Sequence, residues 1–299
     1  MMQGPLQMRF EIRYSTEISY DGLVRENHNE LRAAPTSNDH QQLITYRVTV
    51  QPGARVVSFV DYWGTRVDAF GIREPHVALG VVSEATVETS EPSLVTVSPG
   101  RSDLTEPSFV EEHSEYLDAT AKTDPGPRVI EIAEAVDAMT EGDVVGAVLA
   151  VHRQIHRRLV YEPGATTIAT SAEDVLAHGA GVCQDYAHAA VAICRSLSIP
   201  ARYVSGYFFA ADHATGADSE GDVVEVATHA WFEAAVPGHG WLALDPTNSL
   251  QVGPRHVKIG SGRDYDDVPP IRGVLRGGSG VKVESVVEMR RLVQQQQQQ

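Results

Sequence analysis

Short runs of alternating apolar and polar residues fill the chain from Met8 to Glu91. Turn-forming pairs of residues separate the runs, and period-two alternation between such turns is typical of strands in antiparallel sheets. We therefore predict a β-rich domain over residues 1–100, with antiparallel strands arranged as a sandwich or barrel. The clearest runs are Phe10-Ile12-Tyr14, Tyr46-Val48-Val50 and Val77-Leu79-Val81, and the turn signals are Asp21-Gly22, Pro52-Gly53 and Trp63-Gly64.

The spacing of apolar residues changes in the second half of the chain. Over residues 128–139 and again over 143–160, apolar residues recur three and four positions apart, which predicts two amphipathic helices. Ser171 followed by Asp174 three residues later is typical of the start of a short helix. A further helix is predicted over residues 183–198, because a proline follows soon after it.

Strand-like runs follow these helices, with a polar, glycine-containing segment at 212–222 and an irregular stretch at 246–270 between them. Helices first and antiparallel-type strands afterwards indicate an α+β arrangement rather than a βαβ repeat. We predict a β-rich domain (1–100), an acidic connector (101–127), an α+β core (128–293) and a disordered, low-complexity glutamine tail (294–299). The predicted strands of the core cover residues 201–210, 223–236, 241–245 and 281–293.

Acidic residues outnumber basic ones by 40 to 24, which gives a formal net charge of −16 at pH 7. This sign opposes binding to nucleic-acid backbones and to anionic membrane surfaces, so neither is expected as a partner. The excess is uneven, because residues 103–143 hold twelve Asp and Glu against two basic residues, Lys122 and Arg128. We expect this acidic segment to be exposed to solvent.

The two cysteines, Cys183 and Cys194, fall in one predicted helix. At a rise of about 1.5 Å per residue, their separation along that helix is too long for a disulfide bond. Free thiols suit a reducing compartment, and the sequence has neither a signal-like N-terminus nor a run of about 18 apolar residues. We therefore expect a cytoplasmic protein, while the oligomeric state stays open.

Cys183 follows a glycine-containing breaker and opens its predicted helix. Unpaired backbone N–H groups and the helix dipole favour an anion at that position, so they favour a thiolate and supply donors for an oxyanion. From its position alone, Cys183 is a candidate nucleophile, although a buried packing role is an equally good interpretation. Cys194 has neither feature and is predicted to pack in the core.

A cysteine nucleophile needs a base within hydrogen-bond reach, and the base needs an acceptor that orients it. His229 is the polar exception in an apolar and aromatic run at 226–233, and Asp245 ends the next predicted strand, sixteen residues later. If the two strands pair across the turn at 237–240, these side chains lie roughly opposite each other. Either residue alone is ordinary in its place, but the order Cys183, His229, Asp245 predicts a catalytic triad.

The region from Gly181 to Asn248 resembles the catalytic core of the transglutaminase-like superfamily of cysteine enzymes. The resemblance implies a papain-like core in which helices pack on an antiparallel sheet. It also implies that Cys183 attacks an amide or ester carbonyl, that His229 moves protons and that Asp245 orients the histidine. The motifs that carry it are Gly181-Val182-Cys183, Ile199-Pro200-Ala201-Arg202-Tyr203-Val204-Ser205-Gly206-Tyr207, His229-Ala230-Trp231 and Trp241-Leu242-Ala243-Leu244-Asp245-Pro246-Thr247.

Three further segments are similar to the bacterial branch of this superfamily, whose members carry a β-rich region before the core. The residues after the nucleophile also fit this branch better than the animal cross-linking enzymes, which argues against calcium dependence. The sequence has no EF-hand loop or comparable set of acidic ligands, so we expect neither a metal nor another cofactor. The three segments are Asn29-Glu30-Leu31-Arg32-Ala33-Ala34-Pro35, Asp61-Tyr62-Trp63-Gly64 and Gly262-Arg263-Asp264-Tyr265-Asp266-Asp267-Val268-Pro269-Pro270.

Four residues near the nucleophile are further candidates for the site. Animal relatives use a side-chain donor upstream of the cysteine, so the resemblance makes Tyr161 a candidate oxyanion donor. Gln184, Asp185 and His188 follow Cys183 closely and are candidates for lining a substrate pocket. For Asp185 and His188, hydrogen bonds that fix the helix against neighbouring loops are the favoured interpretation.

Two further pairs of residues have alternative interpretations. Trp231 and Trp241 flank the proposed His–Asp pair, where they would wall an acyl-binding tunnel or pack in the core. His152 and His156 are four residues apart on a predicted helix and could share a metal. Their segment lacks the glutamate of a zincin and is flanked by cations, so a solvated helix face is the favoured interpretation.

We predict a cysteine-dependent enzyme that forms a thioester on Cys183 from the amide of a protein or peptide substrate. Transfer to water would make it a protease or amidase, and transfer to a primary amine would make it a transglutaminase; hydrolysis is slightly favoured. The main alternative is a protein-binding scaffold that kept the fold without turnover, and a metalloenzyme is a third interpretation. The glutamine tail could itself be an acyl donor, although a solvated tail is favoured.

Overall fold

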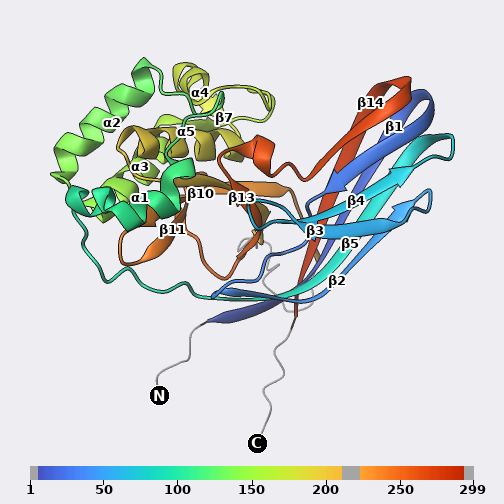
Figure 1. Ribbon diagram of the computed structural model, residues 1–299, viewed down its shortest axis with the longest axis horizontal. Helices are drawn as coiled ribbons and strands as arrows, with labels where there is room; N and C mark the ends of the chain where they lie inside the picture. Colours follow the sequence, from blue (N-terminus) through green and yellow to red (C-terminus); the bar gives the residue numbers. More distant parts are fainter. Residues whose placement is uncertain (1–5, 211–222, 293–299) are drawn as a thin grey trace, which may run out of the picture.

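The computed structural model describes residues 6–210 and 223–292, so the loop predicted at 212–222 and the glutamine tail lie outside the described residues. The described chain forms a long antiparallel sheet, a second antiparallel sheet and a group of helices (Figure 1). The helices pack on one face of the second sheet, and the long sheet packs on its other face. The predicted α+β class, with an antiparallel N-terminal part and a helix-on-sheet core, is confirmed.

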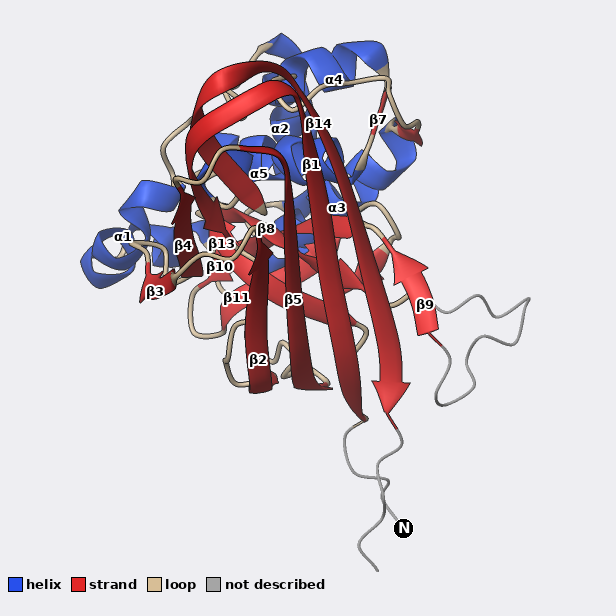
Figure 2. Ribbon diagram, turned by 90° about the vertical axis from the view of Figure 1, so that its right-hand side faces the viewer, coloured by secondary structure: helices blue, strands red, loops and turns tan. Residues whose placement is uncertain are grey.

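Within the described residues the first sheet has seven strands, five of which lie side by side in the order β2-β5-β1-β14-β9 (Figure 2). At one end β4 pairs with β1, and β3 pairs with β4. All these pairs are antiparallel. The strands are β1 (Gln7–Leu31), β2 (Gln41–Gln51), β3 (Val56–Val60), β4 (Arg66–Ile72), β5 (His76–Ser90), β9 (Val223–Val226) and β14 (Ile271–Leu292).

Side chains of β1 alternate between a buried and a more exposed face, as the period-two pattern predicts. Phe10, Ile12 and Tyr14 are buried and share one hydrophobic core with Tyr207 and Val257 of the second sheet. The first sheet therefore obtains its core by packing against the second sheet. A sheet with one apolar face needs such a partner layer to be stable in water.

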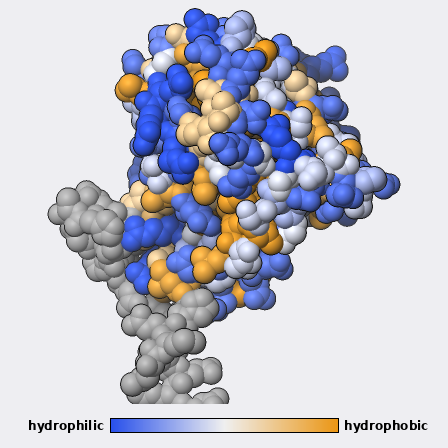
Figure 3. Space-filling view, turned by 90° about the vertical axis from the view of Figure 1, so that its left-hand side faces the viewer, coloured by the Kyte–Doolittle hydropathy of each residue, from blue (hydrophilic) through white to orange (hydrophobic). Residues whose placement is uncertain are grey.

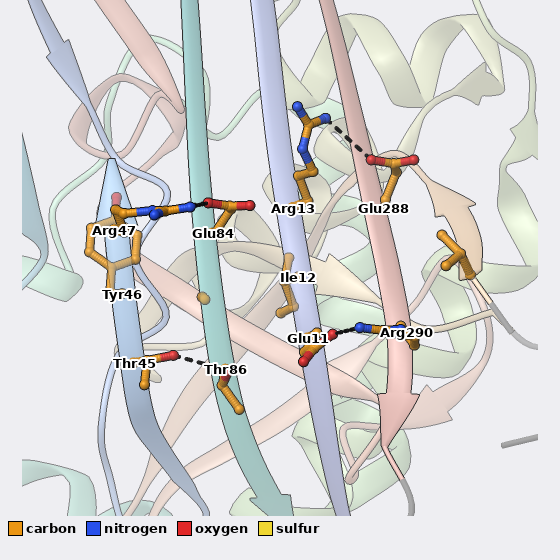
Figure 4. A pocket seen from close by; sticks show the side chains of 12 residues that line it. Glu11, Ile12, Arg13, Thr45, Tyr46, Arg47, Glu84, Thr86, Glu288 and Arg290 are labelled. Atoms are coloured by element: carbon orange, nitrogen blue, oxygen red, sulfur yellow. Dashed lines mark hydrogen bonds and ion pairs between the residues drawn. The ribbon is translucent and has the colours of Figure 1, made fainter. Parts of the chain in front are cut away.

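The opposite face of the first sheet carries rows of alternating charge (Figure 4). A hollow of about 560 Å³ over these strands is lined by side chains that already pair with one another across neighbouring strands. Exposed ion pairs contribute little stability each, but they keep the face polar. The pairs are Arg47–Glu84, Arg13–Glu288 and Glu11–Arg290.

Asp21 and Gly22 do not form the predicted turn. β1 continues through them, and its register against β14 shifts on both sides of Asp21. Gly22 has a φ of +118°, which other residues rarely adopt, so this glycine lets the strand bend at a bulge without ending. The turn predicted at Trp63-Gly64 does occur between β3 and β4, where the Gly64 amide donates to the Asp61 carbonyl at 3.0 Å.

The C-terminal strand β14 belongs to the first sheet, where it pairs with β1 from Arg9↔Leu292 to Leu31↔Ile271. This differs from the predicted organisation, in which residues 128–293 form the core. The strand predicted at 223–236 also divides into two, because β9 pairs with β14 and β10 lies in the second sheet. A strand's own pattern shows that it is half-buried, but it does not show which strand it pairs with.

The second sheet has the order β12-β11-β10-β8-β13, with antiparallel neighbours throughout. β13 falls within the stretch 246–270, so the prediction that this stretch is irregular is wrong. Val257 and Ile259 of β13 are buried, but glycines at 260 and 262 interrupt the alternation that would have revealed a strand. The strands are β8 (Ala201–Phe208), β10 (Thr228–Val236), β11 (Gly240–Asp245), β12 (Leu250–Gln251) and β13 (His256–Gly262).

The predicted helices at 128–139, 143–160 and 183–198 are confirmed, and Ser171 caps α4 by accepting from the Asp174 amide at 3.2 Å. None of the helices in the described part of the chain is long and apolar enough to cross a membrane. The helices are α1 (Pro107–His113), α2 (Pro127–Thr140), α3 (Val144–Arg158), α4 (Ala172–His178) and α5 (Cys183–Ser196), with short 3-10 turns η1 (Arg101–Thr105), η2 (Ser114–Tyr116) and η3 (Tyr265–Asp267). A small parallel pair joins β6 (Val160–Tyr161) to β7 (Ala180–Gly181).

The acidic segment at 103–143 is exposed, as predicted. Its carboxylate side chains are all exposed or half-buried, whereas Leu104, Val129 and Val136 turn inward to the core. Figure 3 shows the side of the molecule that lies at the left of Figure 1, where hydrophilic residues cover much of the surface. The negative charge therefore lies at the outer surface around α1 and α2.

Arg195 joins the acidic connector to the core. Its guanidinium is buried and donates to the carbonyls of Tyr116, Ala201 and Arg263 and to the Thr123 hydroxyl, at 2.7 to 3.2 Å. Burial lowers the pKa of Arg195 to about 10, which still leaves the group charged at pH 7. One side chain therefore ties α5 to the connector, to the start of β8 and to the segment after β13.

Replacing Arg195 with lysine should destabilise the protein, because one ammonium group cannot reach acceptors that surround a planar guanidinium. We expect the free energy of unfolding to fall by about 2–4 kcal/mol, measured by denaturant titration. The exposed Arg153 of α3 offers the matched control, since Arg153→Lys should change stability by less than about 0.5 kcal/mol. Equal denaturant concentrations at the unfolding midpoint for Arg195→Lys and the wild type would contradict the anchoring role of Arg195.

Candidate active site

The N-terminal end of α5 fixes the position of Cys183. The Asp185 carboxylate turns back to accept from the Val182 amide at 2.7 Å and from the Thr166 hydroxyl at 2.6 Å. A side chain at position 181 would meet Asp185 Oδ2 at 2.6 Å, so this close return needs Gly181. Cys183 is therefore the first residue of a well-capped helix, and it is half-buried.

His229 of β10 brings a base to the thiol. Its side chain is 11% exposed, its ring hydrogen-bonds Asp245, and the Cys183 side chain lies close enough to raise its pKa. The bond to Asp245 joins Nε2 to Oδ2 at 2.8 Å, which leaves Nδ1 as the ring nitrogen for the thiol. The three residues predicted as a triad are thus brought together in the order Cys183, His229, Asp245.

The hairpin of β10 and β11 differs slightly from the predicted one. Its register pairs Phe232 with Leu244, so extending it by one pair would place Trp231, rather than His229, opposite Asp245. His229 and Trp231 are two residues apart and share a face of the strand, so the imidazole still reaches the carboxylate diagonally. The two-residue offset preserves the contact because side chains alternate with a period of two.

The carboxylate of Asp245 is fully buried and accepts five hydrogen bonds from the described residues. Burying a carboxylate is costly unless donors replace the lost water. Here Oδ1 accepts from the backbone amides of Thr247 and Asn248, at 3.0 and 3.2 Å. Oδ2 accepts from His229 Nε2 and Asn248 Nδ2, both at 2.8 Å, and from His256 Nε2 at 3.2 Å.

The electrostatics of the pair favour a charged histidine and a charged aspartate. Burial opposes a charge on His229, but its hydrogen bonds to Asp245 and Cys183 and the charges of these two residues raise its pKa to about 10. Burial also opposes a charge on Asp245, and the hydrogen bonds from His229, His256 and Asn248 outweigh it, so the pKa of this carboxyl is well below its usual range. The resting pair is therefore an imidazolium beside a carboxylate.

His256 of β13 is a residue of the site that the sequence analysis missed. It lies in the stretch predicted as irregular, so no pattern indicated that it faces Asp245. Among the described residues, His229, Asp245 and His256 form the group whose ligand atoms, within 4.8 Å of one another, could hold a metal ion. Hydrogen bonds between the same atoms already account for their proximity, so the cluster needs no ion to explain it.

His152 and His156 anchor the backbone beneath the site. His152 is buried and donates from Nε2 to the Asp245 carbonyl at 3.0 Å, and His156 donates from Nδ1 to the Pro246 carbonyl at 3.0 Å. Burial lowers the pKa of His152, which favours its neutral form. The favoured interpretation of this pair as a solvated helix face is therefore wrong for His152, because both rings point at the loop after β11.

Comparison with known proteins places this geometry in a family. The model of the transglutaminase-like superfamily matches residues 130–246, and the model of the bacterial transglutaminase-like N-terminal region matches residues 10–88. The uncharacterised protein ML0607 of Mycobacterium leprae is 36% identical over 286 residues, which cover 95% of this chain and 99% of that protein. The chain belongs to the transglutaminase-like superfamily.

Other relatives agree with this family and fold. The uncharacterised protein Rv2569c of Mycobacterium tuberculosis is 32% identical over 281 residues, covering 89% of this chain and 87% of that protein. A candidate cysteine protease from Cytophaga hutchinsonii has the same fold, with a TM-score of 0.69 at 22% identity over 96% of this chain and 100% of its own. A protein-glutamine gamma-glutamyltransferase of Pseudomonas aeruginosa is 35% identical over 111 residues, which cover 35% of this chain and 16% of that protein.

Tyr161 lies close to Cys183 in this transglutaminase-like protein. It belongs to β6 and pairs with Gly181 of β7, two residues before Cys183. The residue is 54% exposed, and its partial burial and the neighbouring Cys183 raise the pKa of its hydroxyl, so the group keeps its proton and can donate it in a hydrogen bond. Gln184 is half-buried and donates to the Ile168 carbonyl at 3.4 Å, so its amide contacts the loop after β6.

Asp185 and His188 point into the protein. Burial raises the pKa of Asp185, although the hydrogen bonds from Thr166 and Val182 oppose this shift. His188 is fully buried, accepts from the Tyr265 amide at 3.1 Å, and has its pKa lowered by burial to about 3, so its ring is neutral. Both residues hold the start of α5 against neighbouring loops.

The two tryptophans have different positions relative to the triad. Trp231 is buried, and its ring lies 6.2 Å from that of His229 and 5.4 Å from that of His256. Trp241 instead packs against Tyr116 of the connector, with the Arg202 guanidinium 3.8 Å above its ring. The structure therefore brings Trp231 to the triad and directs Trp241 to the junction with the connector.

Replacing Asp245 with asparagine should lower the pKa of His229 from about 10 toward its ordinary value of about 6.5. The reason is that the variant loses the buried negative charge that stabilises the imidazolium. Titration of the His229 ring signals by NMR would measure the shift, and Asp124→Asn in the exposed connector is a matched control that should leave it unchanged.

The same pair sets a pH dependence of stability. Because the folded pKa of His229 exceeds the unfolded one, its contribution is present below about pH 6.5 and is lost as the pH rises through about 10. The loss of stability caused by Asp245→Asn should therefore be larger at pH 6 than at pH 10. A wild-type His229 that titrates near its ordinary pKa would contradict both expectations.

Proposed function

We propose that this protein is a thiol-dependent acyl-transfer enzyme with Cys183 as nucleophile, His229 as proton carrier and Asp245 as the residue that orients the histidine. The observation that supports it best is the placement of the His229 ring between Cys183, which lies close enough to raise its pKa, and the buried Asp245 carboxylate, which it hydrogen-bonds at 2.8 Å. A nucleophile, a base and an orienting acceptor are the three parts that this chemistry needs.

In the first half of the proposed reaction, His229 already holds the proton as an imidazolium, and the Cys183 thiolate beside it attacks the carbonyl carbon of an amide. The amides of Cys183 and Gln184 lie ahead of the first intrahelical bond, from Asp185 to Val182, and are placed to donate to the resulting oxyanion. The Tyr161 hydroxyl is a second candidate donor. Collapse breaks the C–N bond, and the leaving amine takes its proton from His229.

In the second half, an acceptor attacks the thioester. His229 takes a proton from the acceptor, the C–S bond breaks, and the sulfur of Cys183 leaves as thiolate or, once reprotonated, as thiol. Water gives a carboxylic acid, whereas a primary amine gives a new amide. We favour hydrolysis of a peptide or isopeptide-type amide over amine transfer, with a protein or peptide as the acyl donor.

The names of two similar proteins correspond to these two outcomes. The candidate cysteine protease from Cytophaga hutchinsonii shares the fold over 96% of this chain, whereas the gamma-glutamyltransferase of Pseudomonas aeruginosa aligns with 35% of it. The cytoplasmic location predicted from the free thiols is part of the same proposal.

Cys183→Ala should abolish turnover without unfolding the protein, because the side chain is half-buried and the substitution only shortens it. We expect kcat to fall by about 10⁴-fold or more, as for other nucleophiles that work within a triad. Cys194→Ala is the matched control, since Cys194 is buried in the core and should affect stability but not catalysis. Wild-type activity in Cys183→Ala would refute the nucleophile assignment.

A panel of amide donors, each incubated with and without a primary amine, would identify the acceptor. With hydrolysis favoured, we expect mass spectrometry to find carboxylic acid products that do not require the amine. Dominant amine-linked products would instead assign the protein as a transglutaminase. If no donor reacts and iodoacetamide labels Cys183 no faster than Cys194, the scaffold interpretation replaces the enzymatic one.

A further inference from the structure

We propose that His256 is a positioning residue for this reaction, a neutral imidazole that holds the Asp245 carboxylate in the orientation that His229 requires. The inference rests on the proposed function and extends it from a triad to a relay of four residues. His256 is separated from the nucleophile by Asp245 and His229, so it acts through them and does not touch the reacting atoms.

The hydrogen bonds of His256 define its tautomer. The Gly253 amide donates to Nδ1 at 3.3 Å, so this nitrogen is the acceptor and carries a lone pair. The proton of a neutral ring then lies on Nε2, which donates to Asp245 Oδ2 at 3.2 Å. Burial lowers the pKa of His256, although Asp245 opposes the shift, and the side chain is 2% exposed. A neutral donor therefore faces the carboxylate.

The ring of His256 is held from several strands. Phe208 of β8 packs on it at 4.6 Å between ring centroids, and Trp231 of β10 contacts it edge-on at 5.4 Å. The titratable groups that face it are Asp245 from β11 and His229 from β10, whose ring centroid lies 6.3 Å away. This packing fixes the plane of the imidazole, so its N–H has one direction, toward Oδ2.

His256 donates a hydrogen bond to Oδ2 of Asp245, the same oxygen that accepts from His229. The backbone amides of Thr247 and Asn248 hold Oδ1, but they do not determine how Oδ2 is presented to the histidine. His256 is the donor to Oδ2 that comes from the far edge of the sheet, because β10 and β8 lie between β11 and β13. Without it, the carboxylate can rotate toward the Asn248 side-chain amide, which donates to Oδ2 at 2.8 Å, and away from His229.

Two substitutions of similar length separate the hydrogen bond from packing. His256→Gln keeps an N–H donor at the position of Nε2, whereas His256→Met fills similar space without one. We expect His256→Met to lower kcat by about tenfold or more, the size of one lost hydrogen bond to a charged group, with little change in KM. His256→Gln should recover most of this loss.

The pH profile gives a readout that a purely structural role would not change. Loss of an oriented Asp245 weakens the stabilisation of the His229 imidazolium, so the basic limb of kcat/KM should move to lower pH in His256→Met and return in His256→Gln. The alkylation rate of Cys183 by iodoacetamide, localised by mass spectrometry, should show the same shift without any substrate.

The possible outcomes distinguish this inference from the function on which it rests. If His256→Met, His256→Gln and the wild type have the same kcat and the same basic limb of the kcat/KM pH profile, while Cys183→Ala is inactive, the role of His256 is refuted and the proposed function stands. If both variants lose kcat by the same factor, with equal falls in melting temperature and unchanged pH profiles, the role of His256 is packing. Full activity of Cys183→Ala would refute the proposed function itself.

Discussion

The buried carboxylate of Asp245 is the group on which the rest of the site depends. A lone charge in the interior would be strongly unfavourable, so five donors must converge on it before the fold is stable. They come from β10, from β13 and from the loop after β11, while His152 and His156 of α3 hold the carbonyls beneath. The charged aspartate therefore couples the helical layer to three parts of the second sheet.

Local chemistry explains how much of the site was predictable from the sequence. The glycines before Cys183 predict that a helix begins at this cysteine. His229 and Asp245, one in each of two strands joined by a tight turn, are predicted to face each other. These are short-range signals, and side-chain alternation made the His229–Asp245 contact tolerant of the two-residue error in register. The helix caps and the exposed acidic connector were predictable for the same reason.

Long-range pairing explains what the sequence did not reveal. His256 faces Asp245 only because β13 is aligned on β8 by the whole sheet, and nothing near position 256 indicates that neighbour. The division of residues 223–236 between two sheets and the placement of β14 beside β1 are of the same kind. The interpretation of His152 was wrong because the pattern of a helix shows which face is polar, but it does not show that the Asp245 carbonyl lies opposite that face.

The pairing of β1 with β14 has a consequence for synthesis of the protein. These strands lie near the two ends of the chain, yet they share the longest ladder of the molecule. The ribosome therefore releases the helices and the second sheet before the last partner of the first strand exists. Until then most of one edge of β1 is unpaired and its apolar face is partly uncovered, which makes the nascent chain prone to aggregation.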